Sequence, residues 1–179
     1  MSLYHAALFT ALALILTAAV LIWNASPVAA LARAFPRSRR AAYVTMGLGS
    51  AWTLYQVTKL GESDFGDYRN VIFAAFALLA LAAFRYVPDF LSVRGSCILG
   101  LLVANVLLTA SFMHHGEPPH LVLNIFAYIV ILLALCLAVF PYWVRDFFQW
   151  LFGRPGRPRI VGVGIGLYGL VLLGTALSM

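Results

Sequence analysis

The sequence is poor in charge: 10% of its 179 residues are Asp, Glu, Lys or Arg, whereas 63% are hydrophobic. Soluble proteins carry about 25% charged residues, and no polar stretch here is long enough to form a separate soluble domain. The apolar runs are about 20 residues long, the length that crosses a bilayer core of ~30 Å. We therefore expect a polytopic membrane protein in which residues 1–179 form one transmembrane domain.

Cysteine is also scarce, and both Cys97 and Cys136 lie inside apolar runs, which predicts packing residues rather than a disulfide framework. No positive charge precedes the first apolar run, so we expect this run to be kept as a helix and not cleaved as a signal peptide. The net charge of +6 comes from arginines and lysines in short connections, which is typical of topology determinants. The expected partners are membrane lipids, including anionic headgroups, and not nucleic acid.

Ionisable side chains are absent from the middle of every apolar run. Ion-coupled transporters usually place such groups there, and hydrolytic sites need paired carboxylates or a nucleophile beside a base. The deepest polar residues can instead be satisfied by hydrogen bonds between helices. They are Asn105, Asn124, Thr45, Ser50 and Thr53. These absences favour a protein that is not an enzyme, assign no catalytic residue and leave the cofactors undetermined.

Six apolar runs are present, and each predicts a membrane-spanning helix. The expected spans cover residues 3–23, 41–58, 70–85, 95–113, 120–140 and 160–179. Two shorter passages, residues 27–36 and 142–152, combine apolar residues with arginine and are expected to lie as helices along the membrane surface. The predicted fold is therefore an all-α bundle of six transmembrane helices arranged as three hairpins.

The distribution of positive charge predicts the orientation of this bundle. The first, third and fifth connections hold four, two and four Lys and Arg residues, whereas the second holds two and the fourth and both termini hold none. Positive residues concentrate on the cytoplasmic side, so both termini are expected on the non-cytoplasmic side. We assume a bacterial inner membrane, because the sequence has no Arg- and Ser-rich organelle-targeting arm.

Residues 140–159, FPYWVRDFFQWLFGRPGRPR, combine a high density of aromatic residues with clustered arginines. Both residue types prefer the membrane–water interface, and both are also favoured in protein interfaces. The candidate lipid-contact and interface residues are Trp143, Arg145, Phe147, Trp150, Arg154, Arg157 and Arg159. Two interpretations stay open: the segment either anchors a hairpin at the membrane surface or forms a docking edge for another membrane subunit.

The turn after the fourth expected span contains the ligand types that zinc and related ions prefer. Its candidate metal ligands are His114, His115, Glu117 and His120. The acidic residues of the second connection, Glu62, Asp64 and Asp67, are expected on the same outer face and would add oxygen ligands. The alternative is a solvated turn that is polar because its backbone meets water.

Glycines in two expected spans predict close helix packing, because a helix without side chains at one face admits a neighbouring backbone. These candidate packing residues are Gly47, Gly49, Gly162, Gly166 and Gly169. Gly164, Gly166 and Gly169 also match GxGxxG, but a dinucleotide site needs a preceding strand and an accessible helix N-terminus, which an apolar span does not provide. Whether the last span packs on this chain or on another subunit stays open.

Packing faces, an aromatic edge and short loops favour a small integral-membrane subunit or accessory protein that packs against a larger membrane complex, or that associates with itself. The alternative is a small transporter, channel or metal-handling protein whose outer entrance is formed by the His and acidic loops. A third interpretation, an enzyme acting on lipids at the cytoplasmic surface, rests on arginines that could hold phosphate headgroups.

Overall fold

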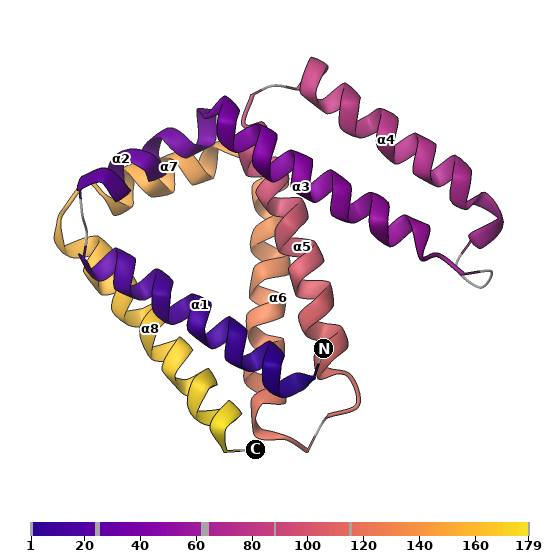
Figure 1. The fold of residues 1–179 in the computed structure, drawn as a ribbon. Helices are drawn as coiled ribbons and strands as arrows, with labels where there is room; N and C mark the ends of the chain where they lie inside the picture. The colour runs from indigo at the N-terminus through magenta and orange to yellow at the C-terminus, as the bar shows by residue number, and fades with distance from the viewer. Residues whose placement is uncertain (1, 24–25, 62–64, 88, 115, 179) are drawn as a thin grey trace. The chain divides into compact units, whose positions relative to one another are not determined.

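The computed structural model describes residues 2–23, 26–61, 65–87, 89–114 and 116–178 (Figure 1). Within these ranges the regular secondary structure is helical and contains no strand, which confirms the predicted all-α class. The helices are α1 (Leu3–Trp23), α2 (Ser26–Ala34), η1 (Phe35–Arg37), α3 (Arg39–Thr58), η3 (Gly66–Tyr68), α4 (Arg69–Tyr86), α5 (Leu91–Ser111), α6 (Pro118–Val139), α7 (Tyr142–Leu151) and α8 (Gly156–Leu177).

Five helical segments among the described residues are long and apolar enough to cross a membrane: α1, η3 with α4, α5, α6 and α8. They identify an integral membrane protein. The remaining long helix, α3, has 20 residues but begins with two arginines and carries several Thr, Tyr and Gly residues, which lower its mean hydropathy. The second of the six predicted spans, residues 41–58, therefore stays a prediction, as do the positions of the termini.

The chain forms two compact units, of which the first comprises Met1–Arg33, Val103–Leu132 and Arg145–Met179. In this unit α1 and α8 lie side by side and run in opposite directions, since Gly162 faces Ala18 and Gly169 faces Ala11 (Figure 1). Gly and Ala in this interface let the two backbones approach closely, and Leu and Ile side chains of α1 pack against the glycines of α8. Alanine and leucine of α5 and α6 complete the core around Leu123.

One polar contact links α8 to α6 inside this unit. The hydroxyl of Tyr168 donates a hydrogen bond of 2.6 Å to the backbone oxygen of Val122. A tyrosine inside an apolar region needs such a partner, because an unpaired hydroxyl there would lose its hydrogen bond to water. The contact therefore fixes the rotation of α8 relative to α6.

The second unit comprises Ala34–Leu102 and Leu133–Val144. Here α3 crosses α5 at Gly95, where an added Cβ would lie 2.5 Å from the backbone nitrogen of Met46. Beside this crossing, the Ser92 hydroxyl donates to the Phe35 backbone oxygen at 2.8 Å and contacts that of Pro36 at 3.1 Å. Ser92 therefore ties η1 to the beginning of α5.

Candidate functional site

Helix α4 differs from the other candidate spans in how little of it the chain covers. None of its spanning window is buried, whereas 17% to 39% of the window is buried in the other four. Its one extensive helix contact is with α3, where the rings of Phe84 and Tyr43 stack with centroids 5.5 Å apart. Val71 and Leu78 are each 66% exposed. Within the second unit, the surface of α4 that these two residues mark is therefore uncovered.

The spacing on this surface suits another helix. Val71, Ala75, Leu78 and Ala82 follow one another at intervals of four, three and four residues, which places them on one helical face. We call these four residues the outer face of α4. Large and small residues alternate along it, and this alternation provides the knobs and holes that a packed helix needs.

Helix α7 carries the aromatic segment and begins directly after Pro141. Trp143, Phe147 and Trp150 lie at intervals of four and three residues, so they share one face of the helix. Each of these side chains is close to half exposed, and the Phe147 and Trp150 rings stack with centroids 6.1 Å apart. The stacked rings form a stiff aromatic ridge along the surface of α7.

The arginines in and around α7 have different roles. Arg157 donates a hydrogen bond of 2.7 Å to the Trp150 backbone oxygen, and its guanidinium lies 4.8 Å from the centre of the Trp150 ring. Arg33 donates to the Phe152 backbone oxygen, also at 2.7 Å. These contacts satisfy carbonyls at the C-terminal end of α7, where a helix is short of donors and attracts positive charge. Arg145 pairs with its neighbour Asp146 at 2.8 Å.

Replacing Arg157 with glutamine should destabilise the protein by about 1 kcal/mol, because the variant loses a charged hydrogen bond and a cation–π contact. Arg154→Gln is the matched control, since Arg154 is exposed and its substitution removes the same charge. Thermal unfolding in detergent, followed by tryptophan fluorescence, would compare the two variants. Equal unfolding temperatures for both would contradict the capping role of Arg157.

In the described part of the turn between α5 and α6, polar groups lie close to one another. Asn124 Nδ2 lies 3.3 Å from His120 Nε2, while His120 Nδ1 lies 3.0 Å from the Ser111 backbone oxygen. The Ser111 hydroxyl also lies 2.8 Å from His120 Nδ1, so both ring nitrogens of His120 have polar neighbours. His114 Nδ1 lies 2.8 Å from the Phe112 backbone oxygen.

His115 lies outside the described residues, and so do Glu62 and Asp64 of the second connection. Among the described His, Cys, Asp and Glu residues, no three lie close enough together to hold a metal ion. The metal site at His114, His115, Glu117 and His120 therefore stays a prediction.

The glycines of α8 face α1 of the same chain. A Cβ added at Gly162 would lie 3.1 Å from the Ala18 backbone oxygen, at Gly166 3.2 Å from Ala18 Cβ, and at Gly169 3.1 Å from Leu14 Cβ. Gly164 has open space around it, so the GxGxxG match is divided between a packed and an unpacked side of α8.

In the second unit, Gly49 faces Ile98 at 3.1 Å, whereas Gly47 has nothing within 4 Å of its added Cβ. The tightest approach occurs at Gly95, which sequence reasoning did not single out. Gly95 is the first residue of an expected span. A glycine at this position can either start a helix or pack against a neighbouring helix, and the sequence does not distinguish the two.

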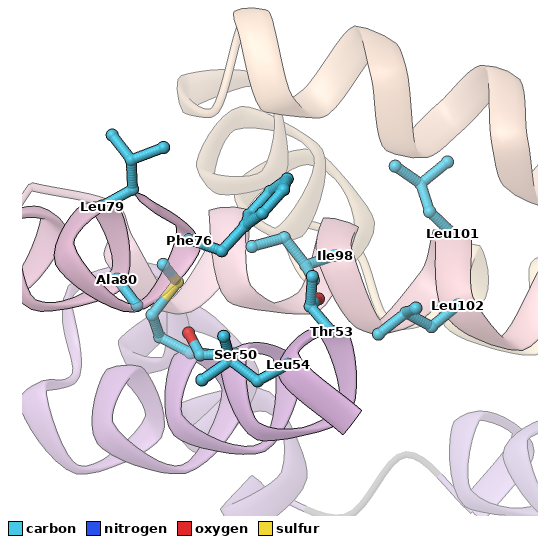
Figure 2. A pocket seen from close by; sticks show the side chains of 10 residues that line it. Ser50, Thr53, Leu54, Phe76, Leu79, Ala80, Ile98, Leu101 and Leu102 are labelled. Carbon is cyan, nitrogen blue, oxygen red and sulfur yellow. The ribbon is translucent and has the colours of Figure 1, made fainter. Parts of the chain in front are cut away.

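A cavity of about 420 Å³ lies in the second unit between α3, α4 and α5 (Figure 2). Phe76, Ile98 and Thr53 point toward one another around it. The Thr53 hydroxyl donates to the Gly49 backbone oxygen at 2.9 Å, so it is satisfied within its own helix. The complete lining is Met46, Ser50, Thr53, Leu54, Phe76, Leu79, Ala80, Ile98, Leu101 and Leu102. This lining contains no ionisable side chain and suits an apolar guest.

Comparisons with known proteins found no relative of this chain. No protein-family model matches the chain, and neither a curated protein nor a solved structure matches it. The function of the chain therefore has to be inferred from its own residues.

Proposed function

We propose that the chain is a small integral-membrane accessory subunit that binds a helix of a larger membrane complex through the outer face of α4. The observation that carries this proposal is the exposure of α4, whose spanning window has no buried residue in the chain. A helix that is apolar on all sides is typical of a segment buried in protein or lipid. Large and small side chains alternate along this face, and this alternation favours a protein neighbour. The residues are Val71, Ala75, Leu78 and Ala82.

Van der Waals packing supports this choice of neighbour. In a bilayer, lipid tails are as apolar as leucine, so helix association depends on close fit rather than on escape from water. Ala75 and Ala82 leave room for the side chains of a partner helix beside Val71 and Leu78. The aromatic ridge of α7 supplies a second contact, because Trp and Phe are enriched in protein interfaces.

The membrane topology that accompanies this function has six spans, with α3 as the sixth. Its hydroxyl groups support this assignment: Thr45 donates to the Ala41 backbone oxygen and Thr53 to that of Gly49. Hydroxyls bonded within their own helix can enter an apolar region without an unmet hydrogen bond. In this topology α2 and α7 lie on the cytoplasmic surface of a bacterial inner membrane, and both termini lie on the opposite side.

A photo-crosslinking amino acid at position 78 should form an adduct with a different membrane protein when activated in native membranes. The matched control is the same amino acid at position 167, because Leu167 is also an exposed leucine in a spanning helix. Mass spectrometry of the adducts identifies the partner. An adduct at position 78 that contains only lipid, or a second copy of this chain, would contradict the proposal.

Filling the outer face should remove the same adduct. Ala75→Phe places a large ring between Val71 and Leu78, and we expect the adduct at position 78 to fall by about tenfold, which corresponds to ~1.4 kcal/mol of lost packing. Val163→Phe introduces the same ring at an exposed position of α8 and should leave the adduct unchanged. Equal adduct yields in both variants would show that the outer face is not the binding surface.

A further inference from the structure

A second cavity lies in the same unit and has the opposite character. It measures about 300 Å³ and is formed by η1, the first turn of α3, the last turn of α4 and the start of α5. Its lining includes Arg37, Ser38, Arg39 and Arg85. Three arginines from separate helical segments therefore line one small cavity, and the Arg37 guanidinium also lies 6.0 Å from the centre of the Phe90 ring.

The charge of these arginines is not balanced within the described part of the chain. No described carboxylate pairs with Arg37, Arg39 or Arg85, and Asp89, which is close to Arg85 in sequence, neither lines the cavity nor forms an ion pair with them. The first turn of α3 contains no acidic residue. Since a helix N-terminus is itself positive, this end of α3 adds to the attraction for an anion.

The walls of this cationic cavity are held in place by hydrogen bonds. Ser92 is 1% exposed, and its hydroxyl holds the backbone of η1, which carries Arg37. The Thr45 hydroxyl contacts the Ser92 backbone oxygen at 3.0 Å and so joins α3 to α5. The Ser38 side chain accepts a hydrogen bond from the Ala41 backbone N–H and fixes the start of α3. The arginines thus extend from a preorganised frame.

The two cavities follow one another along α3 and α4. On α3, Ala42 borders the cationic cavity and Met46 the apolar one. On α4, Phe84 borders the cationic cavity and Ala80 the apolar one. Both pairs are four residues apart, which is about one helical turn or ~5.4 Å. The cationic and the apolar cavity therefore lie about one helical turn apart, with Ala42, Met46 and Phe84 packed between them.

We propose that these two cavities together bind one anionic phospholipid, with its phosphate at Arg37, Arg39 and Arg85 and an acyl chain in the apolar cavity. Guanidinium groups bind phosphate through paired, charge-assisted hydrogen bonds. The apolar cavity falls within the ~300–1,000 Å³ of typical small-molecule sites. Free phosphate would leave this apolar cavity unused, whereas a lipid uses both ends. On α4 the cavity is lined by Phe76, Leu79 and Ala80, whereas the outer face carries Ala75 and Leu78, so the lipid and the partner helix would occupy neighbouring sides of α4.

The test is a titration of the detergent-purified protein with phosphatidylglycerol and, separately, phosphatidylcholine, with bound lipid counted by native mass spectrometry. We expect one phosphatidylglycerol bound about tenfold more tightly than phosphatidylcholine, and a drop of about tenfold in the Arg39→Gln/Arg85→Gln variant. Lys59→Gln/Arg69→Gln removes equal charge at exposed positions elsewhere and should keep the wild-type affinity. Ala80→Phe should abolish retention by filling the apolar cavity, and Ala75→Phe should not.

Four results would overturn the lipid site. Equal affinity for the two lipids would remove the role of the arginines, and equal losses in both double variants would indicate binding to surface charge in general. Inorganic phosphate that displaces phosphatidylglycerol at equal concentration would indicate an ion site without a lipid. If Ala80→Phe instead removed the protein adduct at position 78, the cavity would hold a partner helix and not a lipid.

Discussion

Replacing Gly95 with alanine should lower the thermal unfolding temperature by roughly 4–8 °C, as expected for about 2 kcal/mol of overpacking in a chain of this size. The added methyl group would lie 2.5 Å from the Met46 backbone nitrogen and 2.7 Å from the Thr45 backbone carbon. Atoms of a helix backbone cannot rotate away as a side chain can, so α3 and α5 have to separate. Circular dichroism at 222 nm during heating in detergent would measure the shift.

Gly47→Ala provides the matched control for this substitution. Gly47 lies in α3, in the same unit, and has nothing within 4 Å of an added Cβ. Alanine favours a helix more than glycine does, so this variant should unfold at the same temperature or a slightly higher one. If Gly95→Ala and Gly47→Ala unfolded at the same temperature, this result would contradict the close crossing of α3 and α5.

Replacing Gly169 with leucine should have the largest effect in the first unit, a destabilisation of about 3 kcal/mol. The first atom of the new side chain would already lie 3.1 Å from Leu14 Cβ and Ile15 Cγ1 and 3.3 Å from the Ala11 backbone oxygen. The remaining three carbons have no space, so α1 and α8 must move apart along their shared face. A lower unfolding temperature and faster proteolysis of α1 would report this separation.

Gly174→Leu tests whether position or side-chain size causes that effect. Gly174 belongs to the same helix and has open space around its Cβ. The same leucine should therefore be tolerated there, with an unfolding temperature close to that of the unmodified chain. A loss of stability as large as that of Gly169→Leu would show that any bulky residue harms α8 and would remove the evidence for its packing on α1.

Much of the fold could be predicted, because hydropathy and turn residues are properties of short stretches of sequence. The structure places α1 at Leu3–Trp23, the range of the first predicted span, and Pro141 separates α6 from α7 as expected from its fixed backbone angle. Helix α3 was the difficult case. Its Thr and Gly residues lower its hydropathy to a level shared by soluble helices, so composition alone does not decide whether it crosses the membrane.

The candidate sites were harder to predict because they depend on which helices are neighbours. The glycine pattern of α8 indicated a packing face but could not distinguish α1 from another subunit, since every apolar helix offers a similar surface. Ser50 and Thr53 were noted as polar groups, yet their cavity also needs Phe76 of α4 and Ile98 of α5. Arg37, Arg39 and Arg85 lie in two different connections, and only the packing of α3 on α4 brings them together.

The pairing of α1 with α8 also affects how the protein is made. Helix α1 ends at Trp23 and α8 begins at Gly156, so α1 is synthesised well before its main partner. At about 5–20 residues per second, synthesis of the residues between the two helices takes roughly 7–26 s. During this time the Ala7, Ala11 and Ala18 side of α1 faces lipid. A membrane insertase that shields α1 during this interval would raise the yield of folded protein without any change in its final stability.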